Sequence, residues 1–288
     1  QTVAVPARID LAAFTDPEEL AGLVTRLFDR FPRAEAWFVA YTADLERAWV
    51  VLADCVGLTG AARLGRVLQV GDGRWRADHP DGPGGSMTGA VTAAAAHAAL
   101  LGLPARASRQ ELADSITGPP DAEIGELVRI FDEQSEALGA LSAAGRRRVL
   151  QRLLRDPAPS TVSSVRLAIL AAAAEGQLLA LRQLNRDTAE EQLAAWSSVV
   201  RHSLLAYQAA PLGLLGMAAW QAGDGALQMI CLERLDRIDP GAPLARVIAL
   251  LNREVVPPGA WDEVRRPLLA ALAPALRAAS ARWTAAGG

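Results

Sequence analysis

The sequence contains no lysine and only two asparagines among its 288 residues. All 29 basic residues are therefore arginines. Such a surface suits the recognition of anions, because the planar guanidinium group pairs with carboxylates and phosphates through two hydrogen bonds. Codon bias in a GC-rich genome explains the same composition, since alanine, glycine and proline are also abundant. We favour codon bias, because it accounts for the whole composition and not for the basic residues alone.

Cysteines and long apolar runs are scarce as well. The two cysteines, Cys55 and Cys231, lie far apart in apolar helical contexts, so they form neither a zinc motif nor a redox motif. The most apolar stretches, Thr88–Ala105 and Pro267–Ala279, are too short or too interrupted to span a bilayer. Residues Gln1–Leu11 lack the basic-then-apolar layout of a signal peptide. We therefore expect a soluble, cytoplasmic protein that makes no contact with a membrane.

Neither sign of charge is in large excess, since 29 basic residues face 32 acidic ones. The net charge of −3 gives no reason to expect nucleic acid as a partner. Five arginines do cluster on one predicted helix, but leucines interleave with them and an aspartate follows. We interpret the cluster as a solvated helix face, balanced by Glu133 and Glu136 on the preceding helix. Its members are Arg146, Arg147, Arg148, Arg152 and Arg155.

The first part of the chain alternates strand and helix patterns. One predicted helix begins at Thr15 or Asp16. A second is capped by Asp44 and ends at Gly57. Strands joined by helices predict a small, mostly parallel sheet with flanking helices. We place this α/β domain at residues 1–86 and expect it to be incomplete at its N-terminus. The predicted strands are Thr2–Leu11, Ala36–Thr42, Gly65–Val70 and Arg74–Ala77, the last two joined as a hairpin by Gly71-Asp72-Gly73.

The second part, residues 87–288, is predicted to be an all-helical domain. No strand pattern follows Ala77, and proline, serine and aspartate mark the helix boundaries. The predicted fold is therefore mixed α/β and then all-α, a small sheet followed by a helical array. The predicted helices are Thr88–Leu101, Ser108–Ile116, Asp121–Leu138, Ala143–Leu154, Thr161–Leu184, Thr188–Ala209, Pro211–Gln221, Gly225–Asp236, Leu244–Asn252 and Pro258–Arg282.

A turn between two apolar helices is the most informative local pattern. Gly223 is expected in the left-handed conformation after the first helix, and Asp224 is expected to cap the second. Trp220 is expected to pack across the corner, and Asp239-Pro240 to end the second helix. The register resembles one tetratricopeptide-like helical hairpin at about residues 211–240, so we interpret these residues as structural.

The glycine-rich loop Asp78–Ser86 follows the last predicted strand. It could cradle a phosphate on its backbone N–H groups, or hold a metal through Asp78, His79 and Asp81. It lacks the lysine and the spacing of a P-loop, and it lacks the spacing of a dinucleotide fingerprint. We interpret it as a linker between a strand and a helix.

No other pattern predicts chemistry. Neither His97 nor His202 has a second metal ligand three or four residues further along its helix. No serine lies in the Gly-x-Ser-x-Gly context of a nucleophile elbow. We therefore predict no catalytic residue, no metal and no cofactor, and we favour a protein that is not an enzyme.

Four segments resemble motifs of a known family. They are Arg8–Leu11 (an R-x-D-L strand end), Phe38–Thr42 (a V-x-Y-T strand), Gly71–Arg76 (a D-G-R-W-R hairpin) and Ala210–Ala245 (the C-terminal helices). On these segments the chain resembles the actinobacterial domain-of-unknown-function family 4192, over about Ala7 to Trp261. The resemblance implies the fold and a bacterial cytosol, and it implies no activity.

The chain departs from the family pattern in two places. The family has a Gly-Phe/Tyr-x-Pro motif before the R-x-D-L strand, and this sequence begins after that point. Relatives often carry a cysteine cluster just after the hairpin, where this sequence reads Asp78-His79-Pro80-Asp81-Gly82. Any metal that the cluster holds in relatives is therefore not expected here.

Two functions remain as hypotheses. The leading one is a non-enzymatic interaction or scaffold protein, whose helical surface binds a protein partner or a second copy to form a homo-oligomer. The pair Ile230–Arg237 and Leu244–Leu251 could supply an apolar groove for such a partner. The alternative is a small-molecule or nucleotide-binding α/β domain, with its site beyond the carboxyl ends of the strands. The residues expected at that site are Asp10, Thr42, Asp44, Asp72 and His79.

Overall fold

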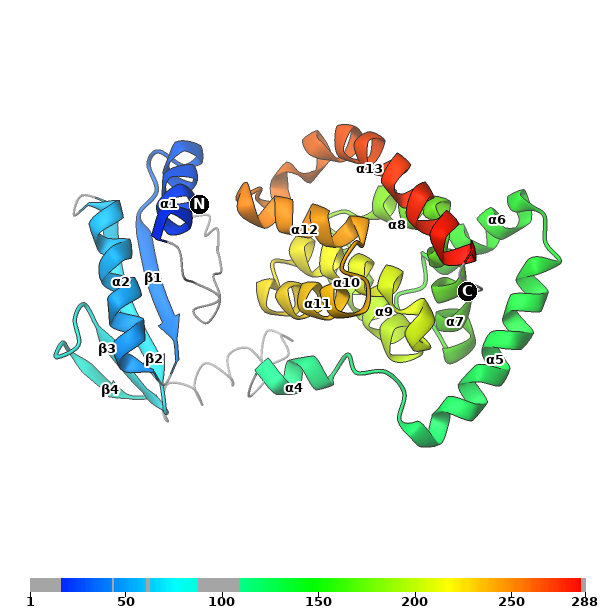
Figure 1. Ribbon diagram of the computed structural model, residues 1–288, viewed down its shortest axis with the longest axis horizontal. Coiled ribbons are helices and arrows are strands. Elements are labelled where there is room, and N and C mark those ends of the chain that lie inside the picture. Colours follow the sequence, from blue (N-terminus) through cyan, green and yellow to red (C-terminus); the bar gives the residue numbers. More distant parts are fainter. Residues whose placement is uncertain (1–16, 43, 61–62, 88–108, 286–288) are drawn as a thin grey trace. The chain divides into compact units, whose positions relative to one another are not determined.

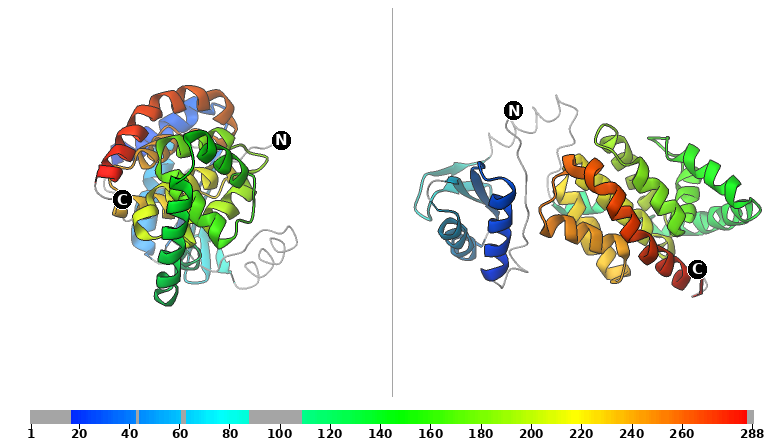
Figure 2. Two further views of the ribbon diagram at one scale, coloured as in Figure 1. Left: turned by 90° about the vertical axis from the view of Figure 1, so that its right-hand side faces the viewer. Right: turned by 90° about the horizontal axis from the view of Figure 1, so that it is seen from above.

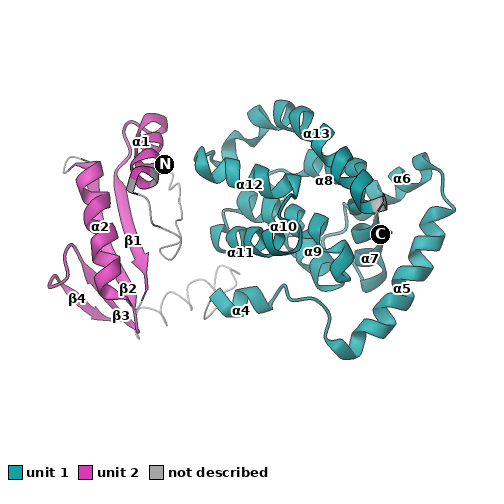
Figure 3. Ribbon diagram, in the orientation of Figure 1, with its two compact units in different colours: residues 1–6, 108–288 teal, residues 7–107 magenta. Residues whose placement is uncertain are grey.

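The computed structural model describes residues 17–42, 44–60, 63–87 and 109–285 (Figure 1). They form two compact units, a sheet with two helices and a unit made wholly of helices (Figure 3). This confirms the predicted fold class, a small sheet with helices followed by a helical array. The predicted strand Thr2–Leu11 and the predicted helix Thr88–Leu101 lie outside the described residues.

The described sheet is mixed, with four strands in the order β1-β2-β3-β4. The parallel pair β1–β2 is joined by helix α2, whereas β2–β3 and β3–β4 pair antiparallel. The mostly parallel arrangement that we predicted therefore describes only the first of the three pairings, because a tight turn after β2 and a short loop after β3 reverse the chain. The bounds are β1 Ala36–Tyr41, α2 Leu45–Thr59, β2 Leu64–Gly71, β3 Arg74–Ala77 and β4 Gly84–Ser86.

The tight turn is the hairpin turn between β2 and β3. Asp72 and Gly73 have φ angles of 51° and 68°, the pair of positive values that a type I′ turn requires. The short loop leads into β4, so the prediction that no strand follows Ala77 was wrong. A Cβ added to Gly84 would lie 2.5 Å from the carbonyl oxygen of Trp75. Glycine allows this close approach but has little strand propensity, which is why the sequence pattern gave no signal.

Helices α1 (Pro17–Arg30) and α2 cover one face of the sheet (Figure 1). Alternate residues of β1 point to opposite faces, so Phe38 and Ala40 pack beneath the helices. The other residues of β1, Trp37, Val39 and Tyr41, are 63%, 38% and 72% exposed. The sheet therefore has one covered face and one face rich in exposed apolar groups.

Helix α2 is longer than predicted. It runs through Gly57 and ends at Thr59, where Gly60 follows with a φ of 72°. A glycine inside a helix is tolerated at a modest cost, whereas positive φ terminates the helix. Gly60, which has the positive φ, therefore marks the end of α2, and Gly57 does not.

The helical unit consists of ten described α-helices and two short 3-10 helices (Figures 1 and 2). Helix α13 runs along the outside of this unit in both figures and contacts α8 and α12. The helices are α4 Arg109–Asp114, α5 Asp121–Gly139, α6 Ala143–Leu153, α7 Thr161–Ala172, α8 Ala174–Gln183, α9 Ala189–Arg201, η2 Leu205–Tyr207, α10 Ala209–Ala222, α11 Gly225–Ile238, α12 Pro243–Arg253, η3 Pro258–Ala260 and α13 Trp261–Ala285.

Helix α10 forms the centre of this unit. Every residue from Pro211 to Gln221 is buried, which is the pattern of a helix surrounded by other elements. Its neighbours include α7, α8, α9, α11 and α12. A Cβ added to Gly213 would lie 2.6 Å from Leu244 Cδ1, and one added to Gly216 would lie 2.7 Å from Ile248 Cδ1. The two glycines therefore let α12 approach α10 closely.

The turn between α10 and α11 is built by its local residues. Gly223 has a φ of 81°, and Asp224 Oδ1 accepts a hydrogen bond from the Leu227 N–H at 2.9 Å. Asp239 and Pro240 form the turn after α11, where Asp239 Oδ1 accepts from the Gly241 N–H at 3.2 Å.

Trp220 does not pack across this corner as we expected. Its ring lies edge-on to Trp261, with centroids 5.7 Å apart, and its N–H donates to the Val256 carbonyl at 3.2 Å. Trp220 leaves α10 on the side that faces the connection between α12 and α13, so it braces that connection instead.

The predicted single helix Thr161–Leu184 is two helices. Helices α7 and α8 meet at an angle of 112° around Ala173, whose ψ of 145° is extended. Gly176 permits the bend, because a Cβ there would lie 2.0 Å from the Leu170 carbonyl oxygen. No single helix among the described residues is long and apolar enough to cross a membrane, and α7 and α8 meet those criteria only when combined across their bend.

Substitution Gly176→Ala tests the bend. We expect it to lower the free energy of unfolding by about 2–3 kcal/mol, because the new methyl group meets backbone that cannot move aside. Gly125→Ala is the matched control, since Gly125 lies within α5 with open space around it. It should raise the free energy of unfolding by about 0.5–1 kcal/mol. Urea unfolding followed by circular dichroism measures both, and equal effects would contradict the assignment.

Candidate functional site

Two of the residues predicted at the sheet edge start helix α2. Thr42 follows β1, and its Oγ1 accepts a hydrogen bond from the Asp44 N–H at 3.0 Å. Asp44 Oδ1 accepts from the Arg47 N–H at 3.1 Å, which is the N-cap interaction. The buried Gln69 side chain donates to the Thr42 carbonyl at 2.6 Å. This edge is thus held together by capping and by cross-strand hydrogen bonds.

The other predicted members do not complete a site. Asp72 lies at the same end of the sheet, in the turn after β2. His79 was expected there too, and that is wrong: the Asp78 N–H donates to the Val67 carbonyl, four residues back along β2. This separates His79 from the edge by about 13 Å or more, at 3.3 Å per strand residue. Asp10 lies outside the described residues.

The described residues contain no group of three His, Cys, Asp or Glu side chains that could hold a metal ion. They do contain one serine–histidine pair that the sequence patterns did not reveal. Ser198 Oγ lies 3.4 Å from His202 Nδ1, and the same Nδ1 lies 2.8 Å from the Ser198 carbonyl oxygen. Because a carbonyl only accepts, Nδ1 donates its proton there and cannot act as a base toward the serine. The pair closes the last turn of α9.

Two further expectations about the helical surface fail. Glu133 does not balance the arginines of α6, because it forms an ion pair with Arg129 on its own helix. The expected apolar groove between α11 and α12 is filled, since its inner side chains all belong to the core. They are Ile230, Leu235, Leu244, Val247, Ile248 and Leu251.

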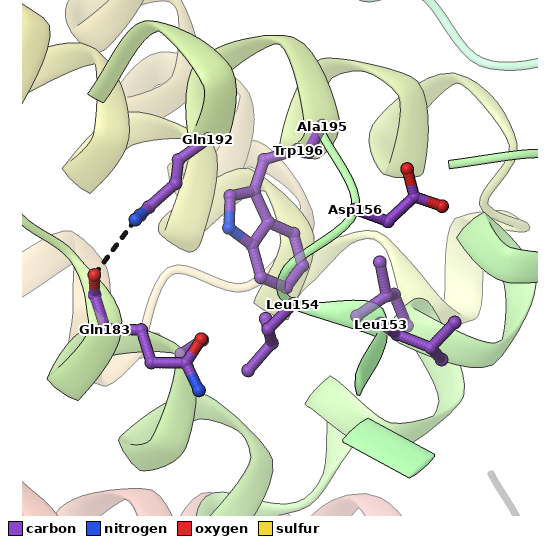
Figure 4. A pocket seen from close by; sticks show the side chains of 9 residues that line it. Leu153, Leu154, Asp156, Gln183, Gln192, Ala195 and Trp196 are labelled. Atoms are coloured by element: carbon purple, nitrogen blue, oxygen red, sulfur yellow. Dashed lines mark hydrogen bonds between the residues drawn. The ribbon is translucent and has the colours of Figure 1, made fainter. Parts of the chain in front are cut away.

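A polar cleft lies in the helical unit. It has a volume of about 480 Å³ and lies among the ends of α6 and α8, the first half of α9, and Arg265 of α13. A small cavity of about 20 Å³, whose lining residues Figure 4 shows, shares five lining residues with the cleft, and we call it the floor of the cleft. The shared residues are Leu154, Asp156, Gln183, Gln192 and Ala195.

Trp196 of α9 lines the floor of the cleft and is only 5% exposed. Its indole nitrogen lies on the side where Gln183 and Gln192 stand (Figure 4). Gln192 Nε2 donates to the Gln183 carbonyl at 3.0 Å and to Thr188 Oγ1 at 2.9 Å. These bonds fix the wall of the cleft. The indole N–H has no hydrogen-bond acceptor among the described residues.

Sequence patterns could not reveal this cleft, because its residues come from five helices and their connections, spread between positions 153 and 265. The comparison with protein families assigns the chain to a family. Residues 1–259 match a family described as a domain of unknown function, DUF4192. The chain belongs to this family. A search of the curated proteins found no match for this DUF4192 chain, and a search of the solved structures found none either.

Neither cysteine of the DUF4192 chain is placed for chemistry. Both are buried and unpaired with each other. Burial, with a smaller contribution from the nearby Asp54 charge, raises the pKa of the Cys55 thiol to about 11. Burial also raises the pKa of Cys231. A nucleophilic cysteine needs the opposite shift, toward the thiolate.

The role of Asp44 can be tested by replacing it with two residues. Asp44→Ala should lower the free energy of unfolding by about 1 kcal/mol through loss of the cap, whereas Asp44→Ser should retain most of it, since serine caps equally well. Urea unfolding monitored by circular dichroism distinguishes them. A loss of stability in Asp44→Ser as large as in Asp44→Ala would show that the carboxylate has another role.

Thiol labelling as a function of pH tests the cysteine environments. With a pKa of about 11, Cys55 is a thiolate in about one folded molecule in a thousand at pH 8, so labelling by a disulfide reagent should be slow and should accelerate up to pH 11. Because the unfolded thiol ionises first, near pH 9, the stability it contributes is complete below that pH and is lost as the pH rises to 11. Rapid labelling of either cysteine at pH 8 would contradict this, with the chain unfolded in guanidinium as the positive control.

Proposed function

We propose that this DUF4192 chain is a non-enzymatic interaction protein, which binds a protein partner or a second copy of itself through the face of its sheet opposite α1 and α2. The observation that carries the proposal is the exposure of Trp37 (63%) and Tyr41 (72%) on that face. Leaving two large aromatic side chains in water forgoes their burial, and such groups concentrate where proteins bind one another.

Apolar residues of the neighbouring strands lie beside these two aromatic side chains. The register of the sheet sets Val39 beside Leu68 and Tyr41 beside Val70, and Trp75 lies opposite Val70 on the next strand. Leu68, Val70 and Trp75 are half-buried, so the apolar surface continues across three strands. The aromatic face, as we call it, comprises Trp37, Val39, Tyr41, Leu68, Val70 and Trp75, with Arg66 beside Trp37.

The composition of the aromatic face suits a protein partner. Tryptophan, tyrosine and arginine are the residue types that contribute most to the affinity of protein interfaces. The sheet also sets these side chains on a rigid element, which lowers the entropic cost of binding. An apolar surface on a partner, or the same face of a second copy, would be complementary to the aromatic face.

The helical surface that we expected to bind the partner gives less support. Apart from the pair Ile124 and Val128 on α5, the exposed large apolar side chains described there lie on separate elements. Small groups of exposed apolar residues are ordinary. The alternative of a ligand at the sheet edge also gains little, because Thr42 and Asp44 are used to start α2. The free, buried cysteines support a cytoplasmic location, and the lysine-free composition supports an origin in a GC-rich genome such as an actinobacterial one.

The double substitution Trp37→Ala/Tyr41→Ala tests the proposal. We expect the wild-type chain to self-associate or to retain a partner from native-host extract, and the double variant to lose this by about tenfold or more, since interface aromatics each contribute about 2 kcal/mol or more. Light scattering after size exclusion, and quantitative affinity enrichment, measure the two cases. Because both side chains are exposed, the variant should fold normally.

The matched control is Val50→Ala/Leu205→Ala, which removes two exposed apolar side chains away from the aromatic face. It should leave association unchanged. Association that is equal in the wild type and the Trp37→Ala/Tyr41→Ala variant would contradict the proposal, as would a strictly monomeric wild type that retains no partner.

A further inference from the structure

The geometry points to a second binding function: we propose that the cleft around Trp196 binds a small organic anion, with its charged group at the rim and an oxygen acceptor at the floor. This site lies wholly in the helical unit and does not depend on the aromatic face of the sheet. Its lining residues come from α6, α7, α8, α9 and α13 and the connections that follow α6 and α8.

The floor of the cleft offers a hydrogen-bond donor, the indole N–H of Trp196. Trp196 is 95% buried (5% exposed), and its N–H has no acceptor within the described part of the chain. The indole nitrogen is not among the described buried polar atoms that lack a partner, so solvent reaches it, and a bound oxygen could take the place of water there. The floor cavity of about 20 Å³ holds about one such oxygen atom or one water. Leu153, Leu154 and Leu167 surround it, so the part of the ligand that enters is otherwise apolar.

The rim supplies positive charge. Arg155, after α6, and Arg182, at the end of α8, both line the cleft and form no ion pair or side-chain hydrogen bond within the described residues. Two guanidinium groups facing one concave space match a carboxylate or a phosphate, which they can bind through paired hydrogen bonds. Asp156 and Glu191 also line the cleft, so the ligand carries hydrogen-bond donors, such as hydroxyl groups, as well as its negative charge.

A purely structural role explains these arginines less well. Cations at the carboxyl ends of helices complement the helix dipole. Arg265 has this structural role at the end of α8. It donates to the carbonyl oxygens of Arg182 and Leu184 and pairs with Asp262. Arg155 and Arg182 make none of these contacts. Their guanidinium groups are therefore available to a ligand, and Arg265 is the structural member of the set.

The probe for this site is 1-anilinonaphthalene-8-sulfonate, which combines an aromatic body with one anionic group and fluoresces when bound. We expect one probe per chain, displaced by a millimolar oxyanion. Inorganic phosphate and acetate as competitors then distinguish a phosphate site from a carboxylate site. Arg155→Gln and Arg182→Gln should each weaken probe binding about tenfold through loss of a charge-assisted hydrogen bond.

Two further variants make the test specific. Trp196→Phe keeps the ring and removes only the N–H, and should weaken binding of an oxygen-bearing competitor severalfold more than that of the probe. Arg147→Gln, an exposed arginine of α6 that does not line the cleft, is the matched control and should bind as the wild type does. Because Arg155 and Arg182 are exposed, their variants test the site even if Trp196→Phe fails to fold.

Three results would overturn the proposal. One is the absence of any saturable probe binding by the wild type. Another is equal affinity in Arg182→Gln and Arg147→Gln. The third is probe binding that survives both cleft substitutions but disappears in Trp37→Ala/Tyr41→Ala, which would place the probe on the aromatic face of the sheet instead.

Discussion

Burial of helix α10 is the constraint on which the helical unit depends. A helix that is apolar on every side must be enclosed, and α7, α8, α9, α11 and α12 all contact it. Gly213 and Gly216 remove side chains where α12 crosses, so Leu244 and Ile248 reach the helix backbone. Because α8 and α9 are both seated on α10, the positions of Gln183 and Trp196 follow from this packing. The core thus sets the helical walls of the cleft, and the connections after α6 and α8 complete its lining.

The sheet follows a different constraint, the alternation of side chains along a strand. Helices α1 and α2 cover one face, and that fixes Phe38 and Ala40 beneath them. The same alternation then leaves Trp37 and Tyr41 on the opposite face. The two surfaces that we propose for binding thus differ in character, an apolar one on the sheet and a polar, arginine-rimmed one in the helical unit.

Local features could be predicted from the sequence, and features that depend on distant contacts could not. Gly223 and Asp224 act through their own backbone and the next turn, so their positions follow from residue type. The bend at Ala173 and the strand Gly84–Ser86 depend on how glycine backbone meets Leu170 and Trp75. Thr42 and Asp72 lie at the predicted end of the sheet and His79 does not, because β3 runs antiparallel to β2 and ends at the opposite end. The cleft and its floor draw on five helices, which no spacing rule connects.

Native-state hydrogen exchange tests most directly whether α10 organises the helical unit. If the unit is built around this helix, the amides of Pro211–Gln221 other than the proline should exchange most slowly and only through global unfolding. Amides of the peripheral helix α5 should exchange faster, through local opening. Exchange of the α10 amides at the rate of those in α5 would contradict the account, because it would show that the central helix opens while the rest of the unit stays folded.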